Sequence, residues 1–460
     1  MKLVCRGLFF LLALSFVLLA TQSVIAQAQP TKPNLVLILS DDQGYADVGF
    51  NGCKDITTPN LDRIAKEGAR VTNGYVTYPV CGPSRAGMMT GRYQDRFGFT
   101  TNPAINPKDA RCGLPLTEKN IAELLKPAGY TSMIVGKWHL GTHPTLRPLQ
   151  RGFDEFYGFL SGGHDYFPEN LKLEDLSEVK KSFDWYRTKL LRNEKRVATD
   201  DYLTDELSDA GVDFIKRRHK DGPFFLYMAY NAPHGPLQAT QKYLDRFPDL
   251  EGKRKTYAAM VSAMDDGVGR ILDTLDELKL AENTIVVFLS DNGGATNNAS
   301  RNWPFRGHKG KLFEGGVRVP FAIRWTGTIP ADQKYNKPVS SMDIAATIVA
   351  HAGVKVDPER PLDGVDLVPY LTGKNTKPPH PVLYWRMEPK NALAIRQGAN
   401  KVILSEKDGG DFMFDLWADK SEKTNLYSKQ PDKFEELKAQ VEAWSKDFPG
   451  PAFPSLSEWP

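Results

Sequence analysis

The chain has 460 residues, and the 41% that are hydrophobic are ample for a large core. This length exceeds one ordinary domain and favours a main unit with a smaller second one. The formal net charge is only +3 at pH 7, which argues against a nucleic acid partner, because such a partner requires a strongly basic surface.

Residues 1–28 have the pattern of a secretory signal peptide. Lys2 and Arg6 precede an apolar run at 7–20, and small residues follow up to Ala28. That run is too short and wrongly flanked for a membrane helix, and no later run approaches the roughly 20 apolar residues that such a helix needs. We therefore expect an exported protein, periplasmic or secreted, without membrane insertion.

Three cysteines remain once Cys5 leaves with the expected leader: Cys53, Cys81 and Cys112. An odd number in a compartment that permits disulfides indicates one thiol with a special role. Two arrangements stay open at this point, a Cys53–Cys112 disulfide with an unpaired Cys81, or three free thiols.

Strand-like and helix-like segments alternate along most of the chain. Strands are expected at 34–40, 131–135, 224–230 and 284–290, and helices at 60–67, 120–125, 202–216, 257–278 and 341–352. This alternation predicts an α/β fold with a mainly parallel sheet flanked by helices. The expected strands at 34–40 and 284–290 have similar ends, since the first runs into Ser-Asp-Asp and the second into Ser-Asp-Asn. Because ligands bind beyond the carboxyl ends of such strands, we expect these turns to converge on one site.

The last hundred residues have a different pattern. The Pro-containing segment 355–361 marks a boundary between a main domain at 29–355 and a C-terminal subdomain at 356–460. The subdomain is predicted to be α+β, an antiparallel sheet plus a helix, with strands at 382–385, 393–396, 401–404 and 412–416 and the helix at 431–444. Within the main domain, the charged segment 169–195 lacks periodicity and is expected to be a surface insertion.

The segment 81–92 reads Cys-Gly-Pro-Ser-Arg-Ala-Gly-Met-Met-Thr-Gly-Arg and is the most informative in the chain. Pro83 suits the first turn of a helix, whose free N–H groups would face Cys81 and an anion bound beside it. Arg85 follows one turn later, so its guanidinium can return to the same side as an oxyanion clamp. For an isolated cysteine, simple packing would be the better interpretation.

Four residues at the two similar strand ends, Asp41, Asp42, Asp291 and Asn292, offer only oxygen ligands. Such ligands suit calcium or magnesium rather than zinc. A single Asp after a strand is more often a turn or helix-cap residue. Four of them in two matched turns favour a metal site.

Basic residues stand in three further motifs. Lys137 and His139 lie in Gly-Lys-Trp-His-Leu-Gly, and His234 lies in Asn-Ala-Pro-His-Gly-Pro. Lys309 stands five residues before Glu-Gly-Gly, and Lys311 is the alternative candidate for the same role. If the chain is extended there, Lys137 and His139 project to one face, so that one can stabilise an anion while the other moves a proton. Taken singly, each of these side chains could instead be an ordinary surface residue.

Together these segments resemble the sulfatase family of the alkaline-phosphatase-like superfamily, whose signature is Cys-x-Pro-Ser-Arg followed by Thr-Gly-Arg. Gly-Lys-Trp-His-Leu-Gly is similar to a second family motif. The chain departs from the usual pattern at Met88 and Met89, where Leu is usual, but the apolar volume is nearly conserved. The resemblance implies an alkaline-phosphatase-like fold, with 29–355 as the catalytic domain.

The resemblance also implies a chemistry. In that family a formylglycine-generating enzyme oxidises the cysteine to formylglycine, whose hydrate attacks sulfur and later expels sulfate. The implied metal is Ca²⁺, and the implied catalytic residues are Cys81, Arg85, Lys137, His139, His234 and Lys309. The converted Cys81 would join Asp41, Asp42, Asp291 and Asn292 as a calcium ligand. His139 would act as the base, His234 with Lys309 as the acid, and Arg85 with Lys137 would neutralise the sulfuryl oxygens.

Several stretches, above all Asn-Trp-Pro-Phe-Arg-Gly-His at 302–308, are similar to the arylsulfatase B group of N-acetylgalactosamine-4-sulfatases. This similarity implies a sulfated carbohydrate substrate, with a galactose-type 4-sulfate favoured and a hexose 6-sulfate or an aryl sulfate still open. The candidate sugar contacts are Asn302, Trp303, Arg306, His164 and Asp165. A Trp that anchors its own loop is an equal alternative to sugar stacking. The rival functions are a phosphodiester or phosphonate hydrolase of the same superfamily and a non-catalytic carbohydrate-binding relative.

Overall fold

The computed structural model describes residues 32–455. The predicted leader at 1–28 lies outside these residues. Over the described range, none of the helices combines the length and the apolar character needed to cross a membrane.

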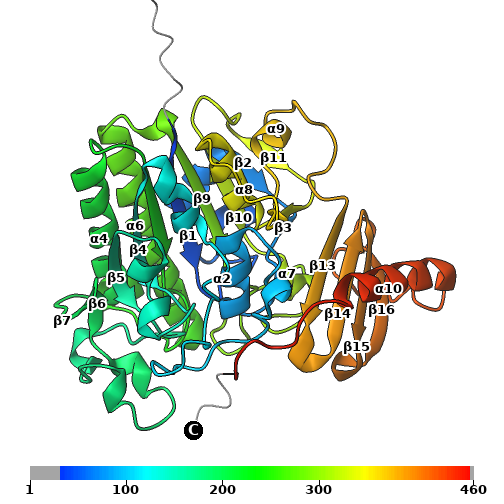
Figure 1. Cartoon of the computed structure of the whole chain (residues 1–460), viewed down its shortest axis with the longest axis horizontal. Helices are drawn as coiled ribbons and strands as arrows, with labels where there is room; N and C mark the ends of the chain where they lie inside the picture. Colours follow the sequence, from blue (N-terminus) through cyan, green and yellow to red (C-terminus); the bar gives the residue numbers. More distant parts are fainter. Residues whose placement is uncertain (1–31, 456–460) are drawn as a thin grey trace, which may run out of the picture. The chain divides into compact units, whose positions relative to one another are not determined.

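A ten-stranded sheet runs through the main part of the chain (Figure 1). Its strands are β1 (Asn34–Ser40), β2 (Ala69–Val71), β4 (Thr131–Lys137), β5 (Glu155–Phe159), β6 (Leu190–Arg192), β7 (Lys195–Val197), β8 (Phe224–Ala229), β9 (Thr284–Ser290), β10 (Phe321–Arg324) and β11 (Gln333–Tyr335). Their order is β11-β2-β10-β9-β1-β8-β4-β5-β6-β7. The five strands from β9 to β5 are parallel, whereas β10 and the β6–β7 hairpin run antiparallel to their neighbours. The predicted mainly parallel sheet is confirmed.

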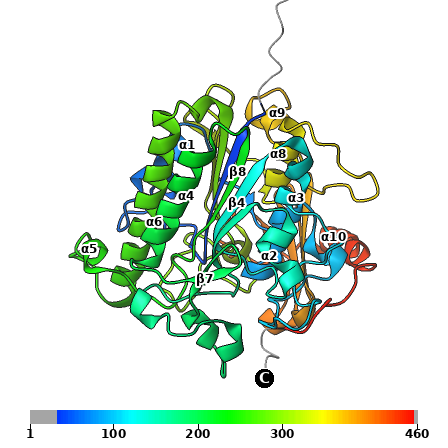
Figure 2. The same cartoon turned by 60° about the vertical axis from the view of Figure 1, so that its left-hand side comes forward.

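Helices cover both faces of this sheet. The α-helices that precede the C-terminal sheet are α1 (Pro59–Lys66), α2 (Cys81–Thr90), α3 (Ile121–Leu125), α4 (Leu203–Arg218), α5 (Gln241–Leu244), α6 (Gly252–Glu277), α7 (Glu314–Val317), α8 (Asp343–His351) and α9 (Val368–Leu371). Figure 2 shows α1, α4 and α6 on one side of the sheet and α2, α3 and α8 on the other. A separate two-stranded sheet of β3 (Gly74–Tyr75) and β12 (Val339–Ser340) lies beside the large one, with Gly74 close to Phe321 of β10.

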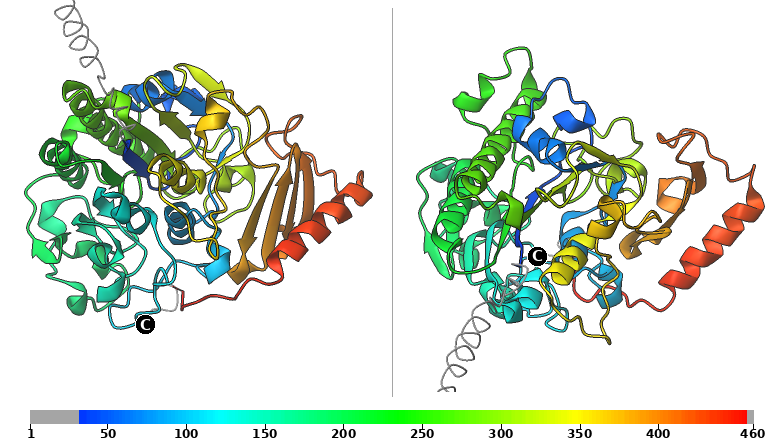
Figure 3. Two further views of the ribbon diagram at one scale, coloured as in Figure 1. Left: turned by 45° about the horizontal axis from the view of Figure 1, so that its top comes forward. Right: turned by 90° about the horizontal axis from the view of Figure 1, so that it is seen from above.

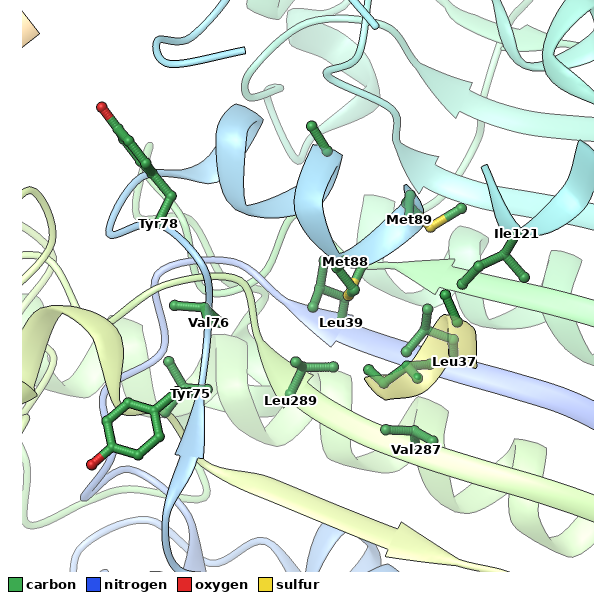
Figure 4. Packing of buried hydrophobic residues seen from close by; sticks show 14 of the residues in the cluster. Leu37, Leu39, Tyr75, Val76, Tyr78, Met88, Met89, Ile121, Val287 and Leu289 are labelled. Carbon is green, nitrogen blue, oxygen red and sulfur yellow. The ribbon is translucent and has the colours of Figure 1, made fainter. Parts of the chain in front are cut away.

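The alternation of side chains along β1 explains this layering. Leu37 and Leu39 belong to one core cluster, with Met88 and Met89 of α2 (Figure 4), whereas Ile38 packs in the cluster formed with α4 and α6. All seven residues of β1 are buried. A strand covered on both faces is an uninterrupted apolar run, and this is why its bounds follow from the sequence.

The C-terminal part is a four-stranded antiparallel sheet of β13 (Val382–Met387), β14 (Ala392–Gln397), β15 (Asn400–Ser405) and β16 (Gly410–Asp415), followed by α10 (Pro431–Ser445). Figure 3 shows α10, in red, lying along this sheet. Phe434 and Leu437 of α10 pack on Val402, while Trp385 and Phe414 on the other face join the main core. The predicted α+β arrangement is confirmed. The boundary at 355/356 stays a prediction, because the described residues belong to one compact unit.

The structure settles two points that the sequence left open, namely the state of the three cysteines and the conformation of the segment 169–195. Cys53, Cys81 and Cys112 are all free thiols, so the arrangement without a disulfide is the one observed. The segment 169–195 is largely turns and exposed loop, but it ends in β6, which with β7 extends the large sheet.

Candidate active site

The carboxyl ends of β1 and β9 bring four polar residues together. The two strands are parallel neighbours with Ser40 opposite Ser290, so Asp41 and Asp42 lie beside Asp291 and Asn292. The Asp42 amide donates to Asp291 Oδ1 at 3.2 Å, and Asn292 Nδ2 donates to Asp42 Oδ1 at 2.8 Å. All four side chains are buried. The convergence expected from the two similar turns is therefore present.

Cys81 begins α2 directly above these carboxylates. Its Sγ lies 3.6 Å from Asp41 Oδ1, 3.9 Å from Asp42 Oδ1 and 3.1 Å from Lys309 Nζ. Burial raises the pKa of the Cys81 thiol to about 12, although Lys137 and Lys309 oppose the rise. An unmodified Cys81 is thus a neutral thiol and a poor nucleophile.

Arg85 points to the same side of α2 as Cys81, as its spacing predicts. Its Nε and one terminal nitrogen donate to Asp291 Oδ2 at 3.0 and 2.9 Å, and the other nitrogen donates to the Lys137 carbonyl at 3.1 Å. Lys137 Nζ lies 2.5 Å from Asp41 Oδ2. Both cations are fully buried and therefore depend on the carboxylates that face them.

Lys309, rather than Lys311, reaches the site. Its ammonium lies 2.7 Å from Asp42 Oδ1 and 2.8 Å from Oδ2. Lys311 instead pairs with Asp408. Burial would raise the pKa of Asp42, but Lys309 and His234 outweigh it and hold that pKa below its ordinary value.

His139 adopts a conformation that its sequence pattern does not predict. Strand β4 ends at Lys137, and His139 has a left-handed φ of 56°, so the condition that the chain is extended from Lys137 to His139 is not met. The imidazole is only 1% exposed, yet neither ring nitrogen has a hydrogen-bond partner among the described residues. Burial, with Lys137 and Arg85 nearby, holds the pKa of His139 well below its ordinary value. The ring is therefore neutral, with an unused acceptor nitrogen.

His234 lies on the Asp42 side of the site. Its Nδ1 donates to the Gly235 carbonyl at 2.7 Å, which leaves Nε2 toward Asp42 Oδ2 at 3.6 Å. Burial lowers the pKa of His234 to about 4, with Asp42 opposing and Lys309 assisting.

Two of the predicted metal ligands, Asp41 and Asp42, belong to a group of potential ligands. Their carboxylate oxygens lie within 4.8 Å of one another and of the ligand atoms of Cys81 and His234, whereas Asp291 is not in this group. In addition, the buried Asn292 Oδ1 accepts no hydrogen bond from the described residues, so it is an oxygen acceptor with no structural use. Carboxylate and amide oxygens are the ligands that calcium and magnesium prefer.

The predicted sugar contacts from the 302–308 segment have mainly structural partners. Asn302 Oδ1 accepts from the Gly294 amide at 2.8 Å and its Nδ2 donates to the Gly294 carbonyl at 2.9 Å. Arg306 donates to the Glu422 carbonyl at 3.2 Å and lies 4.1 Å from the ring centroid of Phe313. Trp303, by contrast, is 74% exposed.

His164 and Asp165 make hydrogen bonds that hold the insertion at 169–195 in place. Both ring nitrogens of the buried His164 lie near carbonyl oxygens, those of Asp165 at 2.9 Å and Thr188 at 2.8 Å. Asp165 Oδ1 accepts from Asn170 Nδ2 at 2.8 Å. Contact of these residues and of the 302–308 segment with a sugar stays a prediction.

Tyr186 is a site residue that the sequence pattern does not single out. It comes from the insertion, and its ring centroid lies 6.5 Å from that of His234. Its hydroxyl makes no hydrogen bond within the described range. The only signal in the sequence is the aromatic group Phe-Asp-Trp-Tyr at 183–186 inside a charged segment.

The sequence matches known protein families. The sulfatase family matches residues 33–354, and the family described as N-sulphoglucosamine sulphohydrolase, C-terminal, matches residues 307–447. The N-acetylgalactosamine-6-sulfatase of Mus musculus is 38% identical over 392 residues, which cover 82% of this chain and 74% of the relative. The Homo sapiens enzyme of the same name is also 38% identical, over 81% of this chain and 72% of its own.

Solved structures agree with these matches. Ps i-CgsB has a TM-score of 0.87 at 39% identity, covering 93% of this chain and 96% of that one. Its complex with k-i-k-neocarrahexaose has a TM-score of 0.86. The expected particular closeness to arylsulfatase B is not confirmed, since these curated relatives are named for the 6-sulfate. The matches nonetheless cover most of the chain, and the chain belongs to the sulfatase family and is a sulfuric ester hydrolase with an alkaline-phosphatase-like fold.

Proposed function

We propose that this sulfatase hydrolyses a sulfate ester of a carbohydrate through a formylglycine made from Cys81. The observation that carries the proposal is the charge around the Cys81 sulfur. Three buried carboxylates, those of Asp41, Asp42 and Asp291, face three cationic side chains. Burying so many charges is costly for the fold, and such clusters are concentrated at functional sites.

We assign Ca²⁺ to the oxygen ligands of Asp41, Asp42, Asp291 and Asn292, completed by the converted Cys81. The unused Asn292 Oδ1 supports this assignment. When bound, the ion would neutralise charge on a sulfuryl oxygen and orient the nucleophile. Because the six charged side chains balance one another, a divalent ion would leave the site positive, which favours an anionic sulfate ester.

The proposed roles follow from position. The hydrated aldehyde of formylglycine supplies one hydroxyl to attack sulfur and a second to expel sulfate, which a thiol cannot do. His139 takes the proton from the second hydroxyl, because it is a neutral base with no hydrogen-bond partner among residues 32–455. His234, with Lys309 beside the same Asp42, protonates the leaving alcohol. For this step the ring must be in its imidazolium form, which the neighbouring Asp42 favours, because Nδ1 keeps its bond to the Gly235 carbonyl and the transferred proton is the one on Nε2.

Arg85 and Lys137, which both lie beside Asp41 Oδ2, complete the assignment. Both are fixed by carboxylates, Arg85 by Asp291 and Lys137 by Asp41. Cations held rigidly in a buried site stabilise developing negative charge without reorganising during the reaction. We assign them to the sulfuryl oxygens.

The substrate class rests on the relatives. The curated relatives are named for N-acetylgalactosamine 6-sulfate, and the solved neighbour binds a neocarrahexaose. Both support a sulfated carbohydrate as substrate. The 302–308 segment favours the 4-sulfate and the curated relatives favour the 6-sulfate, so the two positions are separate outcomes of one substrate screen.

The test combines mass spectrometry with turnover. Protein produced together with a formylglycine-generating enzyme is digested, the peptide containing Cys81 is weighed, and hydrolysis of 4-nitrocatechol sulfate and of 4- and 6-sulfated galactosides is measured, with Cys81→Ala as control. We expect the aldehyde mass, turnover of a sulfated sugar and no turnover by the variant. With the aldehyde present, hydrolysis of a phosphodiester or phosphonate alone would favour the first rival function. Binding of sugars without any hydrolysis would favour the second.

We also propose that the protein is exported and that its domains have the following boundaries. Residues 1–28 are a signal peptide, 29–355 the catalytic domain and 356–460 the C-terminal subdomain, and the converting enzyme acts before the fold buries Cys81. Amino-terminal sequencing of protein recovered from the periplasm or the medium tests the first limit. A mature protein that retains residues 1–28 would contradict it.

A further inference from the structure

A cavity of about 450 Å³ lies next to α2. Three segments contribute most of its lining: residues 100–102, the insertion around Phe183 and the C-terminal subdomain around Lys390, while Tyr78, Val80 and Ser455 complete it. Its volume is in the range of small-ligand sites.

The cavity shares its walls with the active site. Val80, in its lining, directly precedes Cys81, and Asn102 Oδ1 accepts from the amide of the next residue, Gly82, at 2.9 Å. On another side, Lys390 Nζ donates to the Gly310 carbonyl at 2.8 Å. Gly310 follows Lys309, whose ammonium lies 3.1 Å from the Cys81 sulfur. Tyr186 connects the two in space, because its ring centroid lies 5.6 Å from that of Phe183 in the cavity and 6.5 Å from that of His234 in the site.

The wall from the insertion presents an aromatic ring to solvent. Phe183 is 62% exposed and has a left-handed φ of 69°, a conformation that is costly for a bulky residue. Its ring centroid lies 5.6 Å from those of Trp185 and Tyr186. An exposed ring held in a strained backbone beside a site offers a flat apolar face, which suits the C–H face of a sugar.

The wall from the C-terminal subdomain is cationic. Lys390 lies close to Lys311 and Lys407, and Asp408 is the acid that faces this group. Lys311 already pairs with Asp408. The Lys390 ammonium has three N–H donors, of which Gly310 takes one. Donors and positive charge at this wall suit an anionic group with several oxygen acceptors.

We propose that this cavity binds the sugar unit adjoining the one whose sulfate ester is cleaved, and that this adjoining sugar is itself sulfated. Phe183 stacks on its ring and Lys390 binds its sulfate group. This inference rests on the proposed function and makes the substrate a multiply sulfated oligosaccharide. It also gives the C-terminal subdomain a part in substrate recognition.

The test compares two substrates in the full-length converted enzyme. Values of kcat/KM are measured for 4-nitrocatechol sulfate, which is too short to reach the cavity, and for k-i-k-neocarrahexaose. We expect Phe183→Ala and Lys390→Met each to lower kcat/KM for the hexaose about five- to twentyfold, a usual range for one binding side chain. Turnover of the aryl sulfate should change less than about twofold, because the reacting atoms are untouched.

Two control variants match these changes elsewhere on the protein. Trp417→Ala removes another exposed aromatic ring, 82% exposed, and Lys32→Met removes another ammonium bound to one backbone carbonyl, that of Ala128 at 2.9 Å. Both should leave the ratio of the two kcat/KM values unchanged. Equal losses on both substrates, no selective loss, or a hexaose that is not turned over while the aryl sulfate is, would overturn the cavity assignment. Converted enzyme that hydrolyses neither substrate would instead count against the proposed function.

Discussion

His139 combines burial with unused hydrogen-bonding capacity. A buried polar group without a partner costs about 1–3 kcal/mol, and both ring nitrogens of this 1% exposed side chain lack one among the described residues. Gly162 fits the ring closely, because a Cβ there would lie 2.8 Å from Nε2. The fold thus holds the imidazole in place by packing alone and leaves both nitrogens to the reaction.

We therefore expect His139→Asn to lower kcat for 4-nitrocatechol sulfate by about 10²- to 10⁴-fold, the usual contribution of a general base. The thermal midpoint should change little, since no hydrogen bond of the fold is lost. His380→Asn is the matched control, because the Nε2 of that buried imidazole lies 2.7 Å from Asp343 Oδ1, a partner outside the site. It should lower the thermal midpoint and keep kcat. Full activity in the His139 variant would remove this residue from the mechanism.

Asp95 is a second buried residue with an unusual titration. Gln94 Nε2 donates to its Oδ2 at 2.7 Å, but Oδ1 accepts no hydrogen bond from the described residues. Burial raises the pKa of Asp95 from 3.8 to about 7, despite Arg386 nearby. The folded protein then keeps a proton that the unfolded chain releases between about pH 4 and pH 7. Stability from this group is complete below pH 4 and is lost as the pH rises to 7.

The corresponding prediction concerns Asp95→Asn, which keeps the neutral shape and an acceptor for Gln94. The free energy of unfolding of the wild type, relative to that of the variant, should fall by about 2–4 kcal/mol from pH 4 to pH 8, on the scale of 1.4 kcal/mol for each pKa unit. Thermal midpoints of both proteins across this range measure the difference. A difference that is constant with pH would mean that Asp95 titrates normally.

At the level of secondary structure, α2 links the core to the site. Met89 is fully buried and Met88 is 1% exposed, in the cluster with Leu37 and Leu39 that Figure 4 shows. Cys81 begins the same helix. The packing of these methionines therefore sets the position of the nucleophile over the carboxylates.

We expect Met89→Ala to destabilise the protein by about 2–5 kcal/mol, because it opens a cavity in a closed core. Met89→Leu, which restores the residue usual in the family, should cost less than about 1.5 kcal/mol and keep full turnover. Chemical unfolding followed by fluorescence, together with kcat, measures both. Equal effects of the two substitutions would show that volume is not the controlling factor.

The sequence predicts an element or a site residue well when neighbouring residues determine it, and poorly when contacts with distant residues determine it. The bounds of β1 and β9 are predictable because an apolar run and its terminating Asp are both local. The turn at His139 is not predictable from the local pattern. It follows Gly136, whose backbone packs so closely on the Ala229 carbonyl that a Cβ at position 136 would lie 2.0 Å from the carbonyl oxygen. The structural use of Arg306 depends on Glu422, 116 residues away. Tyr186 lies in an insertion without periodicity, so no pattern assigns it to the site.

At the scale of the whole molecule, a buried charge cluster joins the C-terminal four-stranded sheet to helix α7. Lys401 of β15 lies 2.8 Å from Glu314 Oε1 and 3.1 Å from Glu422 Oε1, and none of these side chains is exposed. Glu314 begins α7, just after the loop that carries Lys309. Burial and the neighbouring Glu314 raise the pKa of Glu422 to about 7, with Lys401 opposing. The C-terminal sheet is thus tied to the segment that supplies an active-site lysine.

Lys401→Met should therefore weaken both stability and activity. It leaves two buried acids without their shared cation, a change that costs about 3–5 kcal/mol and lowers the thermal midpoint by roughly 4 °C in a protein of this size. Lys433→Met, which breaks an exposed pair with Glu436, should cost less than about 1 kcal/mol. Adding Glu422→Gln to Lys401→Met should restore part of the loss, because Glu422 is then neutral and Glu314 keeps its pair with Arg318 at 3.1 Å. If this double variant is no more stable than Lys401→Met alone, the loss arises from packing around the lysine stem and not from charge.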